Sequence, residues 1–382
     1  MKAFFRSIFL ALMLVPGCKD PFDPKLPFEE SNFLVVEGYI NVGEDAVTTI
    51  KLSRTTQVKQ GKVRPNYELD ASIFIIDDIG EIYSVIERGQ GRYSTDSLSL
   101  PLDRNYRLRI VTTNGNEYYS EFTTPSVSPE IDSVYWQFAP EGVTIFLATH
   151  DPQNQTDYYQ WDYEEIWEER SPFFSIYSYS RGVYTFRPYE EIQEMRRCWK
   201  DGYPAGLLIT SVATLVPNSP IAKPLIFIPR GTVKLAEKYS VLVKQHALSK
   251  EAYDYLRIME KNTTQVGSFF DPQPSQLNSN ISSSDSGDPV VGYIGAYTTS
   301  QKRIIIKPED LPEWTYSLYC TSVLVTDHPD SLKKYYETLG YIPITFVQDQ
   351  GGDATATKNV CIDCRMRGGK GGDANKPFGW DE

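Results

Sequence analysis

The fold class of this chain follows from the stretch Tyr158-Tyr159-Gln160-Trp161-Asp162-Tyr163-Glu164-Glu165-Ile166-Trp167. Side chains alternate along a strand, so Tyr159, Trp161 and Tyr163 fall on one side and polar residues fall on the other. This alternation predicts a long β-strand with one buried face. Similar runs of aromatic and β-branched residues recur along the chain, so the sequence predicts a mainly β protein.

The N-terminal side of this stretch contains a series of short strands. Asn114-Gly115 is a strong hairpin signal between two of them. Strands at this spacing predict an Ig-like or transthyretin-like β-sandwich over residues 31–124, which a proline-containing boundary at 125–129 ends. The predicted strands cover residues 33–40, 47–52, 71–77, 81–87, 106–112 and 117–122.

A larger β-rich, fibronectin-III-like domain with one or two helices is predicted over residues 130–345. Residues 170–230 are aromatic and proline-containing, and they are expected to form an irregular insertion. The clearest helix covers residues 248–261, with Ser249 as its N-cap and apolar residues at helical spacing. A second, short helix is expected at 331–339. Residues 346–382 form a Cys- and Gly-rich C-terminal segment.

The first residues of the chain have the order of a bacterial lipoprotein signal. Lys2 and Arg6 precede an apolar run, and a small residue, Gly17, stands directly before Cys18. We therefore expect residues 1–17 to be a signal peptide, Cys18 to be lipidated, and residues 18–30 to be a Pro-rich tether. An ordinary secretory signal with a chance cysteine is the alternative. The expected location is the outer membrane, with the protein at the cell surface; the periplasmic face is the alternative.

The chain is acidic, with a net charge of −12 at pH 7. Removal of residues 1–17, which contain two cations and no acids, would make it −14. Such a chain is a poor partner for nucleic acid, whose affinity for proteins comes from Lys and Arg contacts to phosphates. We expect no nucleic-acid partner, and we expect the lipid to provide the contact with the membrane.

Four cysteines remain if Cys18 is acylated, which is an even number in an oxidising compartment. We expect two disulfides, and the sequence leaves all three pairings open. A zinc site is an alternative, but it would normally need a second close cysteine pair. A redox-active pair is another, although glycines follow it where a helix should begin. The four cysteines are Cys198, Cys320, Cys361 and Cys364.

No sequence pattern marks a catalytic centre, and we expect a protein that is not an enzyme and has no metal or cofactor. The histidines His150, His246 and His328 are isolated, although His150-Asp151 could form a catalytic pair. The loop 284–288 resembles part of a calcium loop but lacks its oxygen spacing. Acids of one strand could hold a glycosidase pair, or more simply form its solvated face; they are Asp162, Glu164, Glu165, Glu168 and Glu169.

Aromatic residues crowd the predicted insertion. Such clusters stack on sugars or fill protein interfaces, and they also build cores. A packed core is the favoured interpretation of these residues, and a binding surface is kept as the second possibility. They are Phe173, Phe174, Tyr177, Tyr179, Tyr184, Phe186 and Tyr189.

Several short stretches of the chain together carry a resemblance to a known family. They are Cys18 with 20–22, then 34–40, 158–165, 198–199, 248–253, 270–275, 292–293 and 361–365. With these stretches the chain resembles a family of Bacteroidota outer-membrane lipoproteins known as domain of unknown function 4249, and the resemblance covers nearly the whole chain after the signal. It implies an accessory or ligand-binding partner of a TonB-dependent receptor in nutrient uptake, and it assigns no catalytic residue. A cell-surface hydrolase acting on glycan or peptide is the alternative.

Overall fold

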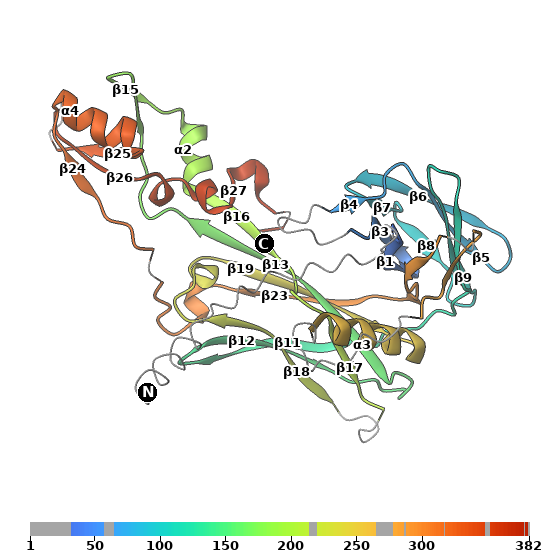
Figure 1. Ribbon diagram of the computed structural model, residues 1–382. Coiled ribbons are helices and arrows are strands. Elements are labelled where there is room, and N and C mark those ends of the chain that lie inside the picture. Colours follow the sequence, from blue (N-terminus) through green and yellow to red (C-terminus); the bar gives the residue numbers. More distant parts are fainter. Residues whose placement is uncertain are drawn as a thin grey trace, which may run out of the picture.

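The structure, a computed structural model, describes residues 32–56, 65–213, 220–264, 278–285, 288–316, 318–347, 352–377 and 379–380. Strands dominate these residues, which confirms the predicted mainly β class. The chain forms a first β module, a second β module and a smaller distal unit on the far side of the second module (Figure 1). The predicted signal peptide, Cys18 and the whole predicted tether lie outside the described residues.

The first module is built on an 11-stranded sheet with the order β20-β10-β9-β5-β6-β7-β3-β1-β21, to which β4 and β22 add at β3 and β1. The six strands predicted in this region are present, and four short ones were missed. Its strands from the N-terminal part of the chain are β1 (Leu34–Asn41), β3 (Thr49–Arg54), β4 (Asn66–Tyr67), β5 (Ser72–Asp77), β6 (Ile82–Gly89), β7 (Arg92–Ser94), β9 (Tyr106–Val111) and β10 (Glu117–Ser120), with β2 (Gly43–Ala46) and β8 (Leu98–Leu100) as a separate pair.

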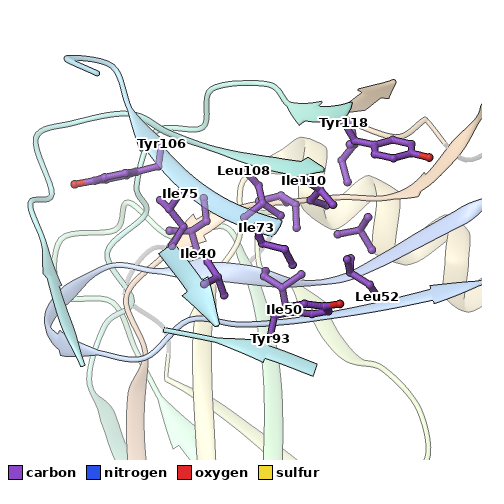
Figure 2. Packing of buried hydrophobic residues seen from close by; sticks show 14 of the residues in the cluster. Ile40, Ile50, Leu52, Ile73, Ile75, Tyr93, Tyr106, Leu108, Ile110 and Tyr118 are labelled. Atoms are coloured by element: carbon purple, nitrogen blue, oxygen red, sulfur yellow. The ribbon is translucent and has the colours of Figure 1, made fainter. Parts of the chain in front are cut away.

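The sheet curves over a single core, so that its two halves face each other as in a sandwich. Ile73 and Ile75 of β5 and Leu108 of β9 meet Ile50 of β3 and Tyr93 of β7 between the halves (Figure 2). All five side chains are almost completely buried. Alternate positions along each strand supply this core, which is the period-2 pattern that predicted the strands.

Three strands of the first module come from a distant part of the sequence. They are β20 (Ile281–Ser283), β21 (Val290–Gly292) and β22 (Ala296–Tyr297). β20 pairs with β10, and β21 and β22 run parallel to β1. The predicted unit of residues 31–124 did not include them, because such pairing leaves no local trace in the sequence.

The second module is a sandwich of two sheets. β11, β12 and β18 form one sheet, and the other has the order β23-β19-β13-β16-β27, with β17 paired to β13. Trp161 and Tyr163 of β13 pack against Val143 and Ile145 of β12 in the shared core. The strands are β11 (Ile131–Ala139), β12 (Gly142–Thr149), β13 (Tyr158–Arg170), β16 (Arg197–Gly202), β17 (Leu208–Ser211), β18 (Ile221–Pro229), β19 (Tyr239–Ala247), β23 (Ser300–Ile306) and β27 (Lys370–Gly371).

Residues 170–230 are not the irregular insertion that the sequence predicts. They contain a hairpin, the helix α2 (Tyr189–Arg196) and three strands that complete the sheets of the second module. The prediction failed because prolines weaken strand patterns. β18 contains Pro224 and Pro229, yet it lies at the edge of its sheet, where proline is tolerated.

The predicted helix at 248–261 is confirmed as α3 (Lys250–Thr264). The Ala252 amide donates to Ser249 Oγ at 3.1 Å, so Ser249 caps the helix as expected. The region predicted as a short helix contains α4 (Pro329–Leu332) and the helical segment η3 (Lys333–Thr338). Shorter helical turns are η1 (Val233–Leu235), η2 (Pro308–Asp310), η4 (Asn359–Cys361), η5 (Cys364–Arg367) and η6 (Asp373–Asn375).

The distal unit combines two small sheets with α4 and η3. One is the hairpin of β14 (Tyr177–Ser180) and β15 (Val183–Phe186), and the other is β24 (Val323–Val325), β25 (Tyr341–Phe346) and β26 (Ala354–Lys358). Disulfides tie the C-terminal segment to this end of the molecule.

The two expected disulfides are present, and they join Cys198 to Cys364 and Cys320 to Cys361. The sequence spacing of the first pair is 166 residues, so local sequence could not have chosen this pairing.

Candidate functional site

The seven aromatic residues proposed as a binding surface divide into two groups. Tyr177, Tyr179, Tyr184 and Phe186 share one face of the β14–β15 hairpin, because they occupy directly paired positions. The Tyr179 ring lies 4.6 Å from the Tyr336 ring between centroids. Tyr177 and Tyr184 make edge-on contacts with Phe346 at 4.8 and 4.9 Å. Most of this face therefore packs within the distal unit, and it forms part of a core.

Three of the seven remain open to solvent. Phe174, Phe186 and Tyr189 are 51%, 76% and 70% exposed. The Arg196 guanidinium lies 5.4 Å from the Phe174 ring centroid. These side chains are spread over a loop, a hairpin end and the start of α2, and Phe173 beside them is half-buried.

The acids of β13 also divide, and the predicted solvated face is wrong for three of them. Glu165, Glu168 and Glu169 are buried, whereas Asp162 is exposed and Glu164 is half-buried. Glu165 was wrongly predicted to be solvated. It lies two positions after Tyr163, so its side chain falls on the same face of β13 and points into the sandwich. After Trp167, both faces of β13 are covered by other parts of the chain. The neighbouring residues Glu168 and Glu169 are therefore both buried, and the alternating pattern no longer predicts which side chains are exposed.

Each buried carboxylate is neutralised by cations from other elements. Lys234 Nζ lies 2.8 and 2.9 Å from the Glu165 oxygens, and the Tyr239 hydroxyl donates to the same carboxylate. Arg197 donates to both oxygens of Glu168. These interactions join β13 to η1, β19 and β16, because each buried carboxylate needs its partners to remain charged.

A cleft of about 750 Å³ opens between the first and second modules. Its wall in the second module is a row of side chains, Asp162, Lys244 and Gln301, at directly opposed positions of β13, β19 and β23. Its opposite wall comes from the end of β1 and from β2, including Glu44 and Asp45. Tertiary packing therefore brings together residues that lie up to about 260 positions apart in sequence.

Polar groups lie at the base of this cleft. Thr299 Oγ1 lies 3.1 Å from Asn41 Oδ1 and 3.4 Å from the Tyr39 hydroxyl. The ring of His246, which is buried beneath them, lies 4.5 Å from the Tyr39 ring. Burial lowers the pKa of His246 to about 4, so this imidazole is neutral at pH 7.

The two acids of β13 in the cleft have different surroundings. Lys244 Nζ lies 2.6 Å from Glu164 Oε1. Asp162 accepts a hydrogen bond from the Tyr163 amide, and although much of the residue is exposed, partial desolvation of its carboxyl raises the pKa of that group. The cleft thus offers carboxylates, a cation, hydroxyls and amides to a ligand, which suits a polar molecule with several hydrogen-bonding groups.

The histidines do not form the pair considered from the sequence. His150 Nδ1 lies 2.8 Å from both oxygens of Asp132, on the rim of a smaller pocket of about 240 Å³. Asp151 instead accepts from three backbone amides of the following turn. His328 is exposed and accepts from the Asp330 amide at the start of α4.

The suspected calcium loop is only partly described, since residues 286 and 287 lie outside the described ranges. Its last acid, Asp288, hydrogen-bonds Asn116 Nδ2 at 2.6 Å and the Tyr118 hydroxyl, so it joins this loop to β10. Among the described residues, no group of three or more His, Cys, Asp or Glu side chains is arranged to hold a metal ion.

Sequence reasoning did not find the cleft as a site. Asn41, Lys244 and Thr299 carry no motif, and they come together only when the two modules pack. The available signal was the alternation in residues 158–167, which places Asp162 and Glu164 opposite the buried aromatic residues.

The fold and the cleft define a class of protein, a two-module β protein with a polar inter-module cleft and a disulfide-linked C-terminal segment. The chain belongs to the family described as "Domain of unknown function (DUF4249)", whose family model matches residues 19–303. No curated protein matches the sequence. No helix in the described part of the chain is both long and apolar enough to cross a membrane.

Proposed function

We propose that this protein is a lipid-anchored outer-membrane protein, exposed at the cell surface, that binds a polar ligand in its inter-module cleft. It would act without catalysis as an accessory partner of a TonB-dependent receptor in nutrient uptake. The observation that carries the proposal is the cleft, because both modules contribute hydrogen-bonding groups to one concave space of about 750 Å³.

The N-terminal sequence supports the location. A charged start, an apolar run and Cys18 after a small residue are typical of a lipoprotein signal. The proline-rich residues after Cys18 would hold the modules away from the bilayer, and tethering raises the effective concentration of a binder near a membrane receptor. The resemblance to surface lipoproteins of the family supports the receptor partnership.

The proposal is tested with the full chain carrying Cys18→Ala, to obtain it without lipid, and a panel of oligosaccharides and short peptides. We expect at least one class of probe to bind, and Gln301→Trp to abolish binding because an indole would fill the cleft. The matched control is Asp330→Trp, which places the same indole on a residue whose side chain is 94% exposed on α4. Equal binding by both variants would contradict a role for the cleft.

Partnership with a receptor is tested separately. The tagged, lipidated chain should recover a TonB-dependent receptor from outer membranes, identified by mass spectrometry. Failure to recover any such receptor at endogenous expression levels would contradict this part of the proposal.

One observation favours a hydrolase as the second candidate. Asp162 and Glu164 are two residues apart on the same face of β13, which places their Cα atoms about 7 Å apart. Glycosidases use carboxylate pairs at comparable separations, with one carboxyl kept protonated. Burial raises the pKa of Asp162, while Lys244 pairs with Glu164.

The same panel separates the two candidates. Release of product by the purified chain, lost in both Asp162→Asn and Glu164→Gln, would establish a hydrolase. Binding without product in the unmodified chain would support the non-catalytic role.

A further inference from the structure

The outer face of the first module carries an apolar patch on β5, β6, β10 and the residues directly after β10. Solvated faces of antiparallel sheets are normally polar, and contiguous exposed apolar side chains mark interaction sites. Ile82, Ile86 and Phe122 are 60%, 47% and 46% exposed. This side of the first module faces away from the second module (Figure 1). We call the patch the outer-face patch, and its apolar members are Phe74, Ile76, Ile82, Ile86, Tyr119 and Phe122.

Two arginines cross the outer-face patch between its aromatic rings. The Arg107 guanidinium lies 4.7 Å from the centroid of Phe122 and 5.3 Å from that of Tyr119. The Arg109 guanidinium lies 5.8 Å from Tyr119 and 5.9 Å from Phe74. Cations and rings therefore alternate along the patch, and stacking holds both guanidinium groups in place.

The two arginines differ in their polar partners. Arg109 Nη2 lies 3.0 Å from Glu117 Oε1, so its charge is paired within the module. Arg107 has no hydrogen bond or ion pair to any described residue, and its Nε is buried without an acceptor. A buried donor without a partner is destabilising, and a carboxylate is the acceptor that best matches a guanidinium.

We propose that the outer-face patch is a docking surface for another protein, which presents an Asp or Glu carboxylate to Arg107 and apolar side chains around it. Charge complementarity selects this occupant, because the Arg107 guanidinium forms no ion pair with any described residue and a carboxylate is the group that would pair with it. Arginine and aromatic side chains are also the residues that most often dominate binding at protein interfaces. This inference does not rest on the ligand role of the cleft.

The test replaces Arg107 by Lys in the full-length chain, in the cells where the chain occurs naturally. The substitution keeps a cation but introduces an amine, which a carbodiimide couples to a carboxylate within contact distance. We expect mass spectrometry to find an amide bond between the lysine at position 107 and an Asp or Glu of a different protein.

The matched control is Arg88→Lys on β6, whose arginine pairs with Asp96 of the same module at 2.7 Å. It should give an internal amide to Asp96, which shows that the reagent works, and no bond to the other protein. Recovery of the identified partner with the tagged chain should fall about tenfold or more in Arg107→Gln, the loss typical of a central interface arginine.

Three results would overturn the proposal. One is the absence of any intermolecular amide at position 107 while the control reacts. Another is an amide to a second copy of this chain, which would make the patch a dimer interface. The third is Arg107-dependent flotation of the Cys18→Ala chain with vesicles of phosphatidylethanolamine and phosphatidylglycerol, which would make it a membrane contact. The cleft variant Gln301→Trp should still form the intermolecular amide. Failure of ligand binding at the cleft can therefore be distinguished from failure of docking at the outer-face patch.

Discussion

Substitution of Arg367 by Met should destabilise the second module, because it removes a cation from a buried carboxylate. Glu169 is fully buried on β13. Its carboxylate is paired with Arg367 of the C-terminal segment and with Lys200 of β16, whose Nζ lies 2.7 Å away. Methionine keeps the apolar stem of the side chain and removes the guanidinium, so the change tests the charge rather than the packing.

The expected loss follows from the partners that remain. Removing one partner of a buried ion pair costs about 3–5 kcal/mol, because it leaves an uncompensated charge. Lys200 still neutralises Glu169, so we expect a value near the lower end, about 3 kcal/mol. At about 2–4 °C per kcal/mol for a unit of 150–250 residues, the melting temperature should fall by roughly 6–12 °C.

Tryptophan fluorescence is the appropriate assay. All six tryptophans of the chain lie between residues 136 and 380, and none lies in the N-terminal strands of the first module. Fluorescence during urea or thermal unfolding therefore reports on the second module and its C-terminal segment. Urea is preferred to guanidinium, whose salt would screen the interaction under test.

The matched control is Lys370→Met in the same C-terminal segment. Lys370 pairs with Asp201 at 3.0 Å, but the two side chains are 67% and 40% exposed. An exposed pair of this kind contributes about 1 kcal/mol or less. Equal loss in both variants would refute the reasoning. The double variant Glu169→Gln/Arg367→Met should recover part of the loss, because it also removes the buried charge.

Four further predictions follow from the sequence and the fold. Cys18→Ala should move the protein from the membrane fraction to the soluble fraction, because thioether acylation needs the sulfur; unchanged sedimentation would contradict lipidation. Non-reducing peptide mapping should find the Cys198–Cys364 and Cys320–Cys361 links, and Cys198→Ser should lower the free energy of unfolding by roughly 2–5 kcal/mol; free thiols at these positions would contradict the pairing. Tyr184→Ala should destabilise the distal unit by about 1–3 kcal/mol through lost ring contacts, whereas Phe186→Ala, at a side chain 76% exposed, should change stability by about 0.5 kcal/mol or less; similar melting temperatures for the two variants would count against the packed face. Burial opposes ionisation of Glu168, but hydrogen bonds from Arg197 and Arg170 hold its pKa below the ordinary value of 4.5. The contribution of Glu168 to stability is therefore present above pH 4.5 and is lost as the pH falls through the lowered pKa. Below pH 5 the melting temperature of Glu168→Gln should fall less steeply than that of the unmodified chain, and parallel curves would disprove this role of Glu168.

Features that depend on local periodicity and composition were predictable from the amino-acid sequence alone. The alternation in residues 158–167 predicted β13, and the capping Ser249 with its helical spacing predicted α3. An even number of cysteines beyond Cys18 predicted two disulfides. These predictions succeeded because each feature is set by neighbours in the chain, through alternating exposure, a capped helix start or a simple count.

Features that depend on contacts between distant residues could be seen only in the folded chain. The partner of Cys198 is 166 positions away, and β20 pairs with β10, which precedes it in the chain by more than 160 residues. Glu169 is buried only because the C-terminal segment covers β13 and supplies Arg367. The cleft exists only where the first module meets the second, and Arg107 forms no ion pair within the described part of the chain because no acid there comes within reach of its guanidinium. Burial, pairing and concavity are properties of packed elements, and the local pattern of residues does not encode which elements pack together.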